Sequence, residues 1–424
     1  MKKLWLILIL TAFVLSRLYH LMVMPPFMDE LIYIRWLNTI KTTGDWLLPL
    51  KEFGWEPLGI WLAGLLNRIF PDPLFSLRLN SLIISVFSLI LIIKLFGQLS
   101  GFLYFLSPLI LLHDRLGLRG DNLVILGALM VYFGLKKQKP VWWGLGIAIG
   151  LFSKTTAAAL PFVVGLSYLW LRRKIKKSDF LAAGLALLPI IFFLLTGTLN
   201  SVINKQEVFI GNPLIKNNLL QIIDWLFHYL TWPILLLSFS GMIVAYRNRL
   251  LWLSLLVPLI LLVLSAKLLF PRYLLPIFPF LLIYAGIGFT WLSSHLPKIL
   301  KPFLVIFFFI PAWFSWQILV DFSHAPLSEI DRWQHITGWP SGYGVKELVD
   351  YLKIDTPLVL VTETDDLIKT GIAYYWPDHP MIITQTATSG AYLVTNINNL
   401  TAGELIKEFF RPENKSAIRL WRLP

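Results

Sequence analysis

The sequence predicts a polytopic α-helical membrane protein that carries a small α/β domain at its carboxyl end. Its 424 residues are 57% hydrophobic and only 14% charged, whereas soluble domains carry about 25% charged residues. Long apolar runs recur until about residue 320, and charged residues become frequent only after that point. We therefore expect a transmembrane domain over residues 1–320 and an extracytoplasmic domain over residues 321–424.

About eleven hydrophobic segments precede residue 321, and some are short enough to be re-entrant or broken helices. The first can cross a bilayer at roughly 1.5 Å per residue. No small-residue cleavage site follows it, so we expect a retained span instead of a signal peptide. The predicted segments are 4–24, 79–97, 100–113, 122–135, 141–153, 157–171, 180–198, 229–245, 250–266, 272–292 and 302–320.

The basic residues indicate how these segments are oriented. If the amino terminus is cytoplasmic, the basic runs at 136–139 and 172–177 also face the cytoplasm, as the positive-inside rule requires. An odd number of spans then places the carboxyl-terminal region outside. The net charge of +13 is therefore a topology signal, and nucleic acid is not an expected partner. The sequence has no cysteine, which excludes disulfides, thiolate metal ligands and cysteine nucleophiles.

The first outer loop, residues 25–78, is long enough to hold juxtamembrane helices. Pro25-Pro26 ends the first span, and a helical pattern then runs from Asp29 to about Lys41. A second stretch, Trp55 to Phe70, has apolar residues at helical spacing between polar turns. This pattern is typical of an amphipathic helix on a membrane surface.

The tail alternates short β-type runs with helical stretches, which indicates an α/β domain of about 100 residues. A glycine- and aromatic-rich segment, 338–344, either links this domain to the last span or stacks its rings on a sugar or acceptor. The predicted strands are 358–361, 381–384, 391–394 and 418–421, and the predicted helices are 344–353 and 402–410.

The adjacent acids Asp29 and Glu30 are the first candidate catalytic residues. They begin a helix in an outer loop, close to the membrane surface. A carboxylate there can act as general base toward a hydroxyl or amine nucleophile, or can bind a divalent cation together with other acids. Helix capping by Asp29 is the alternative, because Asp caps helices well.

A second polar cluster occupies the next outer turn, between two hydrophobic segments. Its acids could meet those of the first loop at one site, and its arginines could compensate an anionic substrate. Snorkelling of single charges at the membrane surface is the alternative. The cluster consists of His113, Asp114, Arg115, Arg119 and Asp121. A site for Mg²⁺ or Mn²⁺ would draw on Asp29, His113 and Asp114.

Two further charges stand at the predicted outer ends of spans. Lys154 follows one hydrophobic segment, and Arg272 with its neighbour Tyr273 begins another. A cation near bilayer depth is costly unless it snorkels or pairs, and a lipid phosphate is a suitable partner. Simple interfacial anchoring is the alternative.

The motifs, taken in order, resemble the C-type glycosyltransferase superfamily. The closest branch is that of the protein O-mannosyltransferases and the aminoarabinose lipid A transferases. The residues that carry the resemblance are Pro25 to Tyr33, Trp55 to Leu58, Arg78 to Ser81, His113 to Asp121, Lys154, and Pro271 to Pro276. This sequence has Glu56-Pro57 where a lysine- or histidine-proline pair is common, and it has fewer spans than the longest members.

The resemblance implies a multi-pass enzyme of the cell membrane that transfers a sugar from a polyprenyl-phosphate carrier to an acceptor outside the cytoplasm. The acceptor would be a lipid, a glycan or a protein. Asp29 would activate its nucleophile, with Glu30, Asp114 and Asp121 as supporting acids or metal ligands. The substrate would be bound by Asp114, Arg115, Asp121, Lys154, Arg272 and Tyr273, with the phosphate held by Lys154 and Arg272.

A transporter or a lipid-carrier flippase is the competing interpretation, because such proteins also have many spans and intramembrane charges. Transporters usually contain internal repeats with matching broken helices. We find no internal repeat in this sequence, and this favours the enzyme.

Overall fold

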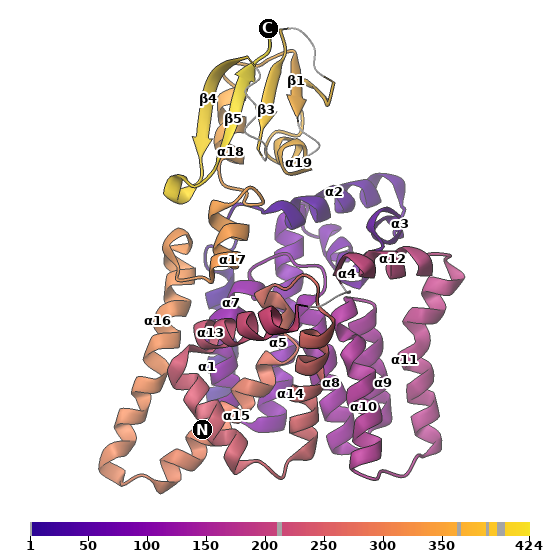
Figure 1. Cartoon of the computed structure of the whole chain (residues 1–424), viewed down its shortest axis with the longest axis vertical. Coiled ribbons are helices and arrows are strands. Elements are labelled where there is room, and N and C mark those ends of the chain that lie inside the picture. The colour runs from indigo at the N-terminus through magenta and orange to yellow at the C-terminus, as the bar shows by residue number, and fades with distance from the viewer. Residues whose placement is uncertain (1, 210–213, 363–365, 387–389, 397–402) are drawn as a thin grey trace. The chain divides into compact units, whose positions relative to one another are not determined.

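The computed structural model describes residues 2–209, 214–362, 366–386, 390–396 and 403–424, and it divides into two units (Figure 1). The first unit comprises Met1–Leu21 with Gly44–Pro326, and the second comprises Met22–Thr43 with Leu327–Pro424. The helix that carries Asp29 therefore groups with the carboxyl-terminal domain and not with the transmembrane helices. The predicted outer loop 25–78 is divided between the two units.

The first unit is helical throughout its described part. Most of its helices coincide with the predicted hydrophobic segments. Its α-helices are α1 (Lys2–Leu18), α3 (Leu48–Phe53), α4 (Leu58–Asn67), α5 (Pro73–Phe96), α6 (Gln98–Leu106), α7 (Pro108–Asp114), α8 (Asp121–Lys137), α9 (Pro140–Leu151), α10 (Ala159–Trp170), α11 (Lys177–Leu195), α12 (Leu199–Phe209), α13 (Ile215–Val244), α14 (Arg249–Ser265), α15 (Phe278–His295) and α16 (Ile306–Val320). Four 3₁₀ segments join them: η1 (Thr155–Ala158), η2 (Pro271–Leu274), η3 (Lys298–Val305) and η4 (Phe322–His324).

Four helical stretches of the described chain are long and apolar enough to cross a membrane. They are Pro73–Phe96, Lys177–Leu195, Ile215–Val244 and Lys298–Val320. Shorter apolar helices accompany them, so the chain is a multi-pass membrane protein. The predicted segment 100–113 is broken into α6 and α7 at Ser107, which caps α7 ahead of Pro108. The count of about eleven complete crossings stays a prediction.

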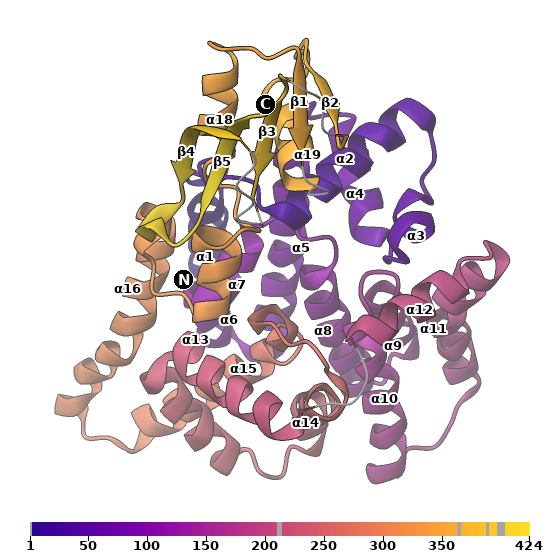
Figure 2. The same cartoon turned by 45° about the horizontal axis from the view of Figure 1, so that its top comes forward.

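The helices of the first unit pack in two groups. In the first group, α9 lies against both α8 and α11, and α10 contacts α8, α9 and α14. In the second group, α13 packs on α15 and α16, and α6 packs on α15 (Figures 1 and 2). Both groups expose many large apolar side chains, such as Leu195, Phe180 and Phe309. In a chain that spans a membrane these side chains face lipid.

The second unit contains the predicted α/β domain and the helix α2. One five-stranded sheet has the order β2-β1-β3-β5-β4. Strand β1 pairs in parallel with β2 and β3, whereas β3–β5 and β5–β4 are antiparallel. The strands are β1 (Val359–Thr362), β2 (Ile382–Thr384), β3 (Tyr392–Thr395), β4 (Glu404–Phe410) and β5 (Ala417–Arg422). The helices are α2 (Met28–Thr43), α17 (Glu329–Arg332), the π-helix η5 (Trp333–Thr337), α18 (Val345–Leu352), α19 (Asp366–Tyr375) and the 3₁₀ turn η6 (Pro412–Asn414).

In the tail, the structure confirms the four predicted strands and the first predicted helix. The second predicted helix is wrong. Residues 404–410 form strand β4 and not the predicted helix. Their sequence, ELIKEFF, contains good helix formers, but pairing with β5 along its length overrides this local preference. Helix α19 was not predicted. It packs on α2 and supplies part of the core of this unit.

Labelling of introduced cysteines will test the predicted topology, because the natural chain has none. Positions Lys137→Cys and Lys174→Cys should react only from the cytoplasmic side. Positions Asp29→Cys and Asp366→Cys should react with an impermeant reagent from outside. Reaction of position 366 from the cytoplasm would contradict both the odd number of spans and the outer placement of the tail.

Candidate active site

The two adjacent acids of α2 have different environments. Glu30 is fully buried, and its Oε2 accepts a hydrogen bond of 3.3 Å from the backbone N–H of Phe27. This contact is the second half of a capping box, in which the third helical residue caps the residue before the helix. Asp29 is only half-buried in the same first turn. Glu30 therefore caps the start of α2.

The start of α2 is fixed by the segment that the sequence marked as a linker or a stacking site. The backbone N–H of Met28 donates to the carbonyl of Pro340 at 2.9 Å, and the ring of Phe27 meets His335 edge-on at 4.7 Å. Gly342 contacts the backbone of Pro26 so closely that a Cβ there would overlap it. Segment 338–344 thus anchors the first turn of α2 within the second unit.

Buried Arg411 stabilises that anchoring segment. Its guanidinium donates to the carbonyls of Ser341 and Trp339, both at 3.3 Å, and to Oδ1 of Asn396 at 2.6 Å. The side chain is 1% exposed. The residues that directly follow β3 and β4 are thereby held to the 339–341 turn. The tail domain thus determines where Asp29 stands within its unit.

In the first unit, three loops converge because two glycines allow close backbone contact. A Cβ on Gly59 would overlap the carbonyl of Arg119, and a Cβ on Gly120 would overlap the carbonyl of Ser153. The backbone N–H of Leu58 also donates to the carbonyl of Phe152 at 3.0 Å. The loop before α4, the loop before α8 and the loop after α9 therefore meet, and their charged residues come together.

Glu56 is the centre of the first charged group at this junction. Its Oε2 accepts from Nζ of Lys205 at 2.8 Å and from Nη1 of Arg119 at 3.1 Å, while the side chain is fully buried. Arg119 also lies over the ring of Trp55 at 4.3 Å. Helix α12 brings Lys205 to this place through an apolar cluster in which Val202 packs with Leu50.

Lys154 and Asp121 form the second charged group. The Nζ of Lys154 is hydrogen-bonded to Oδ1 of Asp121 and lies 4.7 Å from the ring centre of Tyr273. Arg272 is close enough to act electrostatically on both charges of this pair. The structure therefore brings together four of the predicted site residues: Asp121, Lys154, Arg272 and Tyr273.

The two lysines are less basic than usual because the site is dry. Burial lowers the pKa of Lys154 to about 8; Asp121 opposes this shift, and Arg272 and Arg119 add to it. Burial likewise lowers the pKa of Lys205 to about 7, with Arg119 adding to the shift and Glu56 opposing it. Burial alone would raise the pKa of Glu56, but Lys205 and Arg119 hold it below its ordinary value. The carboxylate is thus ionised and keeps both cations in place.

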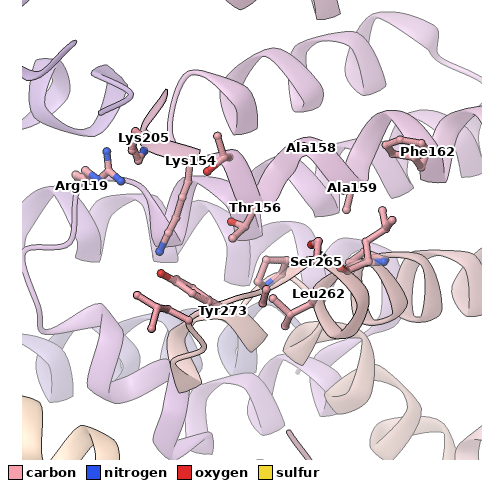
Figure 3. A pocket seen from close by; sticks show the side chains of 16 residues that line it. Arg119, Lys154, Thr156, Ala158, Ala159, Phe162, Lys205, Leu262, Ser265 and Tyr273 are labelled. Atoms are coloured by element: carbon pink, nitrogen blue, oxygen red, sulfur yellow. Dashed lines mark hydrogen bonds between the residues drawn. The ribbon is translucent and has the colours of Figure 1, made fainter. Parts of the chain in front are cut away.

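A cavity of about 200 Å³ opens beside these charges. Arg119, Lys154 and Lys205 stand together at one end, and Ala158, Ala159 and Phe162 line the other (Figure 3). The remaining wall is made mostly of apolar residues from α14 and the segment that follows it: Pro258, Leu261, Leu262, Ala266, Leu268 and Pro276. We call this space the donor cavity. It combines a cationic end with an apolar length.

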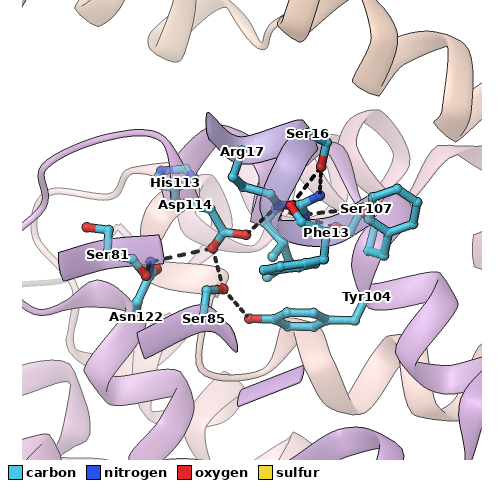
Figure 4. Close-up of polar contacts among 12 residues, drawn as sticks. Phe13, Ser16, Arg17, Ser81, Ser85, Tyr104, Ser107, His113, Asp114 and Asn122 are labelled. Atoms are coloured by element: carbon cyan, nitrogen blue, oxygen red, sulfur yellow. Dashed lines mark hydrogen bonds and ion pairs between the residues drawn. The ribbon is translucent and has the colours of Figure 1, made fainter. Parts of the chain in front are cut away.

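The other predicted cluster residues lie in a different environment. Asp114 is fully buried and accepts from Nε of Arg17 at 3.1 Å, from Oγ of Ser85 at 2.5 Å and from Nδ2 of Asn122 at 3.4 Å (Figure 4). These contacts join α1, α5, α7 and α8. Asp114 does not line the donor cavity, and its contacts with Arg17, Ser85 and Asn122 hold helices together.

His113 and Arg115 also contact backbone. Nδ1 of His113 lies 2.8 Å from the carbonyl of Leu109, one turn earlier in α7. The guanidinium of Arg115 donates to the carbonyls of Ile318 at 2.8 Å, His20 at 2.9 Å and Tyr19 at 3.0 Å. Arg115 therefore joins the ends of α1 and α16 to the loop after α7. Its substrate-binding role stays a prediction.

The Asp114 network gives a stability prediction. Ser85→Ala should lower the free energy of unfolding by about 1.5 kcal/mol, the low end for a hydrogen bond to a charged group, because Arg17 and Asn122 still contact the carboxylate. Ser88→Ala is the matched control. It is equally buried on α5, but its Oγ donates to the carbonyl of Ile84, a neutral acceptor. Thermal unfolding in detergent that showed equal losses would contradict the prediction.

The described residues contain no group of three or more His, Asp or Glu side chains that could hold a metal ion. Around Asp114 the oxygens already accept from Arg17, Ser85 and Asn122, and the ring of His113 is bonded to its own helix. These two residues do not fit a Mg²⁺ or Mn²⁺ site as they stand. We therefore place no metal in the chemistry proposed below.

Sequence reasoning missed the roles of Glu56 and Lys205. Glu56 was noticed only as a departure from the resembling family. Lys205 lies in the polar run Asn204 to Glu207, which has the composition of a solvated helix face. Only the packing of α12 against Leu50 reveals that this lysine is 7% exposed and bonded to Glu56.

Two solved structures share this fold over nearly the whole chain. The crystal structure of ArnT from Cupriavidus metallidurans in the apo state matches with a TM-score of 0.61 and 13% identity, covering 99% of this chain and 97% of that chain. The structure of the same protein bound to undecaprenyl phosphate matches with a TM-score of 0.60 and 12% identity, at the same coverage. No family model and no curated protein sequence matches. At this low identity the likeness shows the fold, and it is the fold that the resembling motifs implied.

Proposed function

We propose that this protein transfers a sugar from a polyprenyl-phosphate-linked donor to a lipid, glycan or protein acceptor outside the cytoplasm. The observation that carries the proposal is the donor cavity. Its cations suit a phosphate, and its apolar length suits the first units of an isoprenoid chain. The fold shared with ArnT, one structure of which is bound to undecaprenyl phosphate, supports the same class of donor.

The charge balance of the site fits the departure of a lipid phosphate. Among the described residues at the junction, four cations (Arg119, Lys154, Lys205 and Arg272) stand against two carboxylates (Glu56 and Asp121). A donor phosphodiester carries one negative charge, and the released phosphate monoester carries about two at neutral pH. Fixed cations in a dry site therefore stabilise the charge that develops as the sugar leaves.

The reaction needs one more group, a base for the acceptor. The acceptor oxygen or nitrogen attacks the anomeric carbon, the bond from that carbon to the phosphate oxygen breaks, and its electron pair stays on the phosphate. Asp29 takes the acceptor proton. Glu30 supports this role by fixing the first turn of α2 through its bond to Phe27.

Binding of undecaprenyl phosphate tests the proposal without knowledge of the sugar or the acceptor. The purified full chain in neutral detergent should gain thermal stability with undecaprenyl phosphate and much less with undecaprenol, which lacks the phosphate. Lys154→Gln and Lys205→Gln should each weaken the effect of the phosphate lipid. The control Lys298→Gln removes a charge that does not line the donor cavity.

Transfer itself is measured with radiolabelled polyprenyl-phosphate sugars and an envelope extract as the source of acceptors. We expect release of polyprenyl phosphate and labelling of an acceptor. Equal stabilisation by undecaprenol and undecaprenyl phosphate would contradict a phosphate site. Movement of the lipid across reconstituted vesicles without release of sugar would favour the flippase or transporter interpretation.

A further inference from the structure

A second cavity, of about 310 Å³, lies at the other ends of the helices that form the donor cavity. We call it the basic cavity. Its lining combines basic residues with residues from α8, α9, α10 and α11. The residues are Gly134, Leu135, Gln138, Pro140, Trp143, Tyr168, Leu171, Arg172, Arg173, Lys174, Lys176 and Asp179.

The two cavities are separated by the length of a helix. Helix α8 begins at Asp121, beside the donor cavity, and reaches the basic cavity at Gly134 and Leu135. From Asp121 to Gly134 the helix rises about 20 Å at 1.5 Å per residue. Helix α10 likewise runs from Ala159, in the donor cavity, to Tyr168, in the basic cavity. In a membrane-spanning bundle, the basic cavity therefore faces the opposite leaflet from the donor cavity.

The basic cavity has an excess of cations. Its one acidic residue, Asp179, already accepts from the hydroxyl of Tyr168 and from the backbone N–H of Lys176, both at 2.7 Å. Arg173 donates to the carbonyl of Leu135 at 2.6 Å, which fixes its guanidinium at the wall. Among the described residues, Arg172, Lys174 and Lys176 form no ion pair with a carboxylate. An anion of about the size of a phosphate would neutralise them.

Two residues of the basic cavity hold an uncommon backbone conformation. Arg172 has φ 49° and Gln138 has φ 52°, a left-handed region that non-glycine residues seldom adopt. Each lies at the end of a helix and directs the chain around the cavity. Conformations of this kind cost free energy and persist mainly where the surroundings require them.

Exposed apolar residues flank the mouth of the basic cavity. Leu169 and Trp170 of α10 and Phe180 of α11 flank its basic residues and expose 76%, 50% and 72% of their side chains. On spanning helices such surfaces contact acyl chains. The positive-inside rule accounts for basic residues in this loop, but it does not account for a cavity lined by them between helices. An anionic lipid fits both features: its headgroup can enter the basic cavity, and its acyl chains can lie along the apolar surfaces of α10 and α11.

We propose that the basic cavity binds the phosphate of an anionic phospholipid from the leaflet opposite the donor cavity. Arg172, Lys174 and Lys176 contact the phosphate, while Arg173 holds the wall. Bound lipid joins α8, α9, α10 and α11 at this end and stabilises the helices that shape the donor cavity at the other. The inference stands apart from the proposed transfer reaction, since it rests on different residues.

Native mass spectrometry of the full chain tests the proposal, with phosphatidylglycerol as the probe and phosphatidylcholine as the neutral lipid. We expect one phosphatidylglycerol to be retained with wild-type protein. The triple variant Arg172→Gln/Lys174→Gln/Lys176→Gln should bind it at least about tenfold more weakly, as expected for lost contacts between charged groups. Lys174→Gln alone, at an exposed residue, gives a milder second variant with a smaller loss in the same direction.

The matched control is Lys136→Gln/Lys137→Gln/Lys139→Gln, which removes the same charge from the neighbouring basic run outside the cavity. It should retain the lipid. Equal losses in both triple variants would overturn the proposal, because they would indicate general attraction to basic loops. Retention of phosphatidylcholine as strong as that of phosphatidylglycerol, or displacement of the lipid by millimolar inorganic phosphate, would also overturn it. Because the assay needs no sugar donor, its result does not depend on the proposed enzyme activity.

Discussion

Asp29→Asn should reduce sugar transfer by about a hundred- to ten-thousand-fold while leaving the protein folded. Asparagine has the same shape as aspartate and begins helices about as well, but it cannot take a proton from an acceptor. Asp29 is half-buried in the first turn of α2. The measurement is kcat with a polyprenyl-phosphate sugar, together with thermal unfolding to verify the fold.

The neighbouring acid gives the control. Glu30→Gln keeps an oxygen that can accept from the N–H of Phe27, so both the helix start and most of the activity should remain. Glu30→Ala removes the cap and should cost about 1 kcal/mol of stability. If Glu30→Gln were inactive while Asp29→Asn retained transfer, the roles of the two acids would be exchanged. If both variants were fully active, neither residue would be the base.

The sequence predicted the elements well where local signals are strong. Apolar runs placed most of the helices of the first unit, and the helical pattern after Pro25-Pro26 placed α2 within about two residues. Alternating apolar residues placed β1, β2, β3 and β5. Strand β4 failed because its residues favour a helix, and only the antiparallel partner β5 decides otherwise. Local propensity is a weak prior where tertiary pairing determines the outcome.

The sequence did not predict which helices and strands belong to the same unit. The Asp29 helix lies more than 280 residues before the tail, yet Pro340 and His335 hold its first turn within one unit. No periodicity encodes such contacts, which depend on packing between distant segments. The same holds for Lys205, whose pairing with Glu56 requires α12 to dock beside Leu50.

The charged motifs separated into two kinds that looked alike in the sequence. Asp121 and Lys154 flank the donor cavity, whereas Asp114 and Arg115, only a few residues away, join helices through Arg17 and backbone carbonyls. A buried charge that has several fixed partners is typical of a structural role. A structural charge can be told from a cavity-lining charge only when its partners are known. The partners of Asp114 and Arg115 lie on α1 and α16, far away in the chain.

Lys154→Gln should raise the KM for the polyprenyl-phosphate donor by about 10- to 150-fold, because the phosphate loses a charge-assisted contact of about 1.5–3 kcal/mol. Arg272→Gln should also raise this KM, since the charge of Arg272 acts on the pair of Lys154 and Asp121. The wild-type KM should also rise as the pH passes about 7 and then about 8, where buried Lys205 and then buried Lys154 lose their protons while the donor phosphate stays anionic. Lys154→Arg keeps its charge and should show a smaller rise.

A double variant separates donor binding from stability. Lys154→Gln leaves the carboxylate of Asp121 buried without its ammonium partner, so the single variant should also unfold at a lower temperature. Lys154→Gln/Asp121→Asn removes that uncompensated charge and should recover much of the lost stability, but the high KM for the donor should remain. Recovery of the wild-type KM in the double variant would mean that Lys154 only neutralises Asp121, and the phosphate would then be held by Arg119, Lys205 and Arg272 without it.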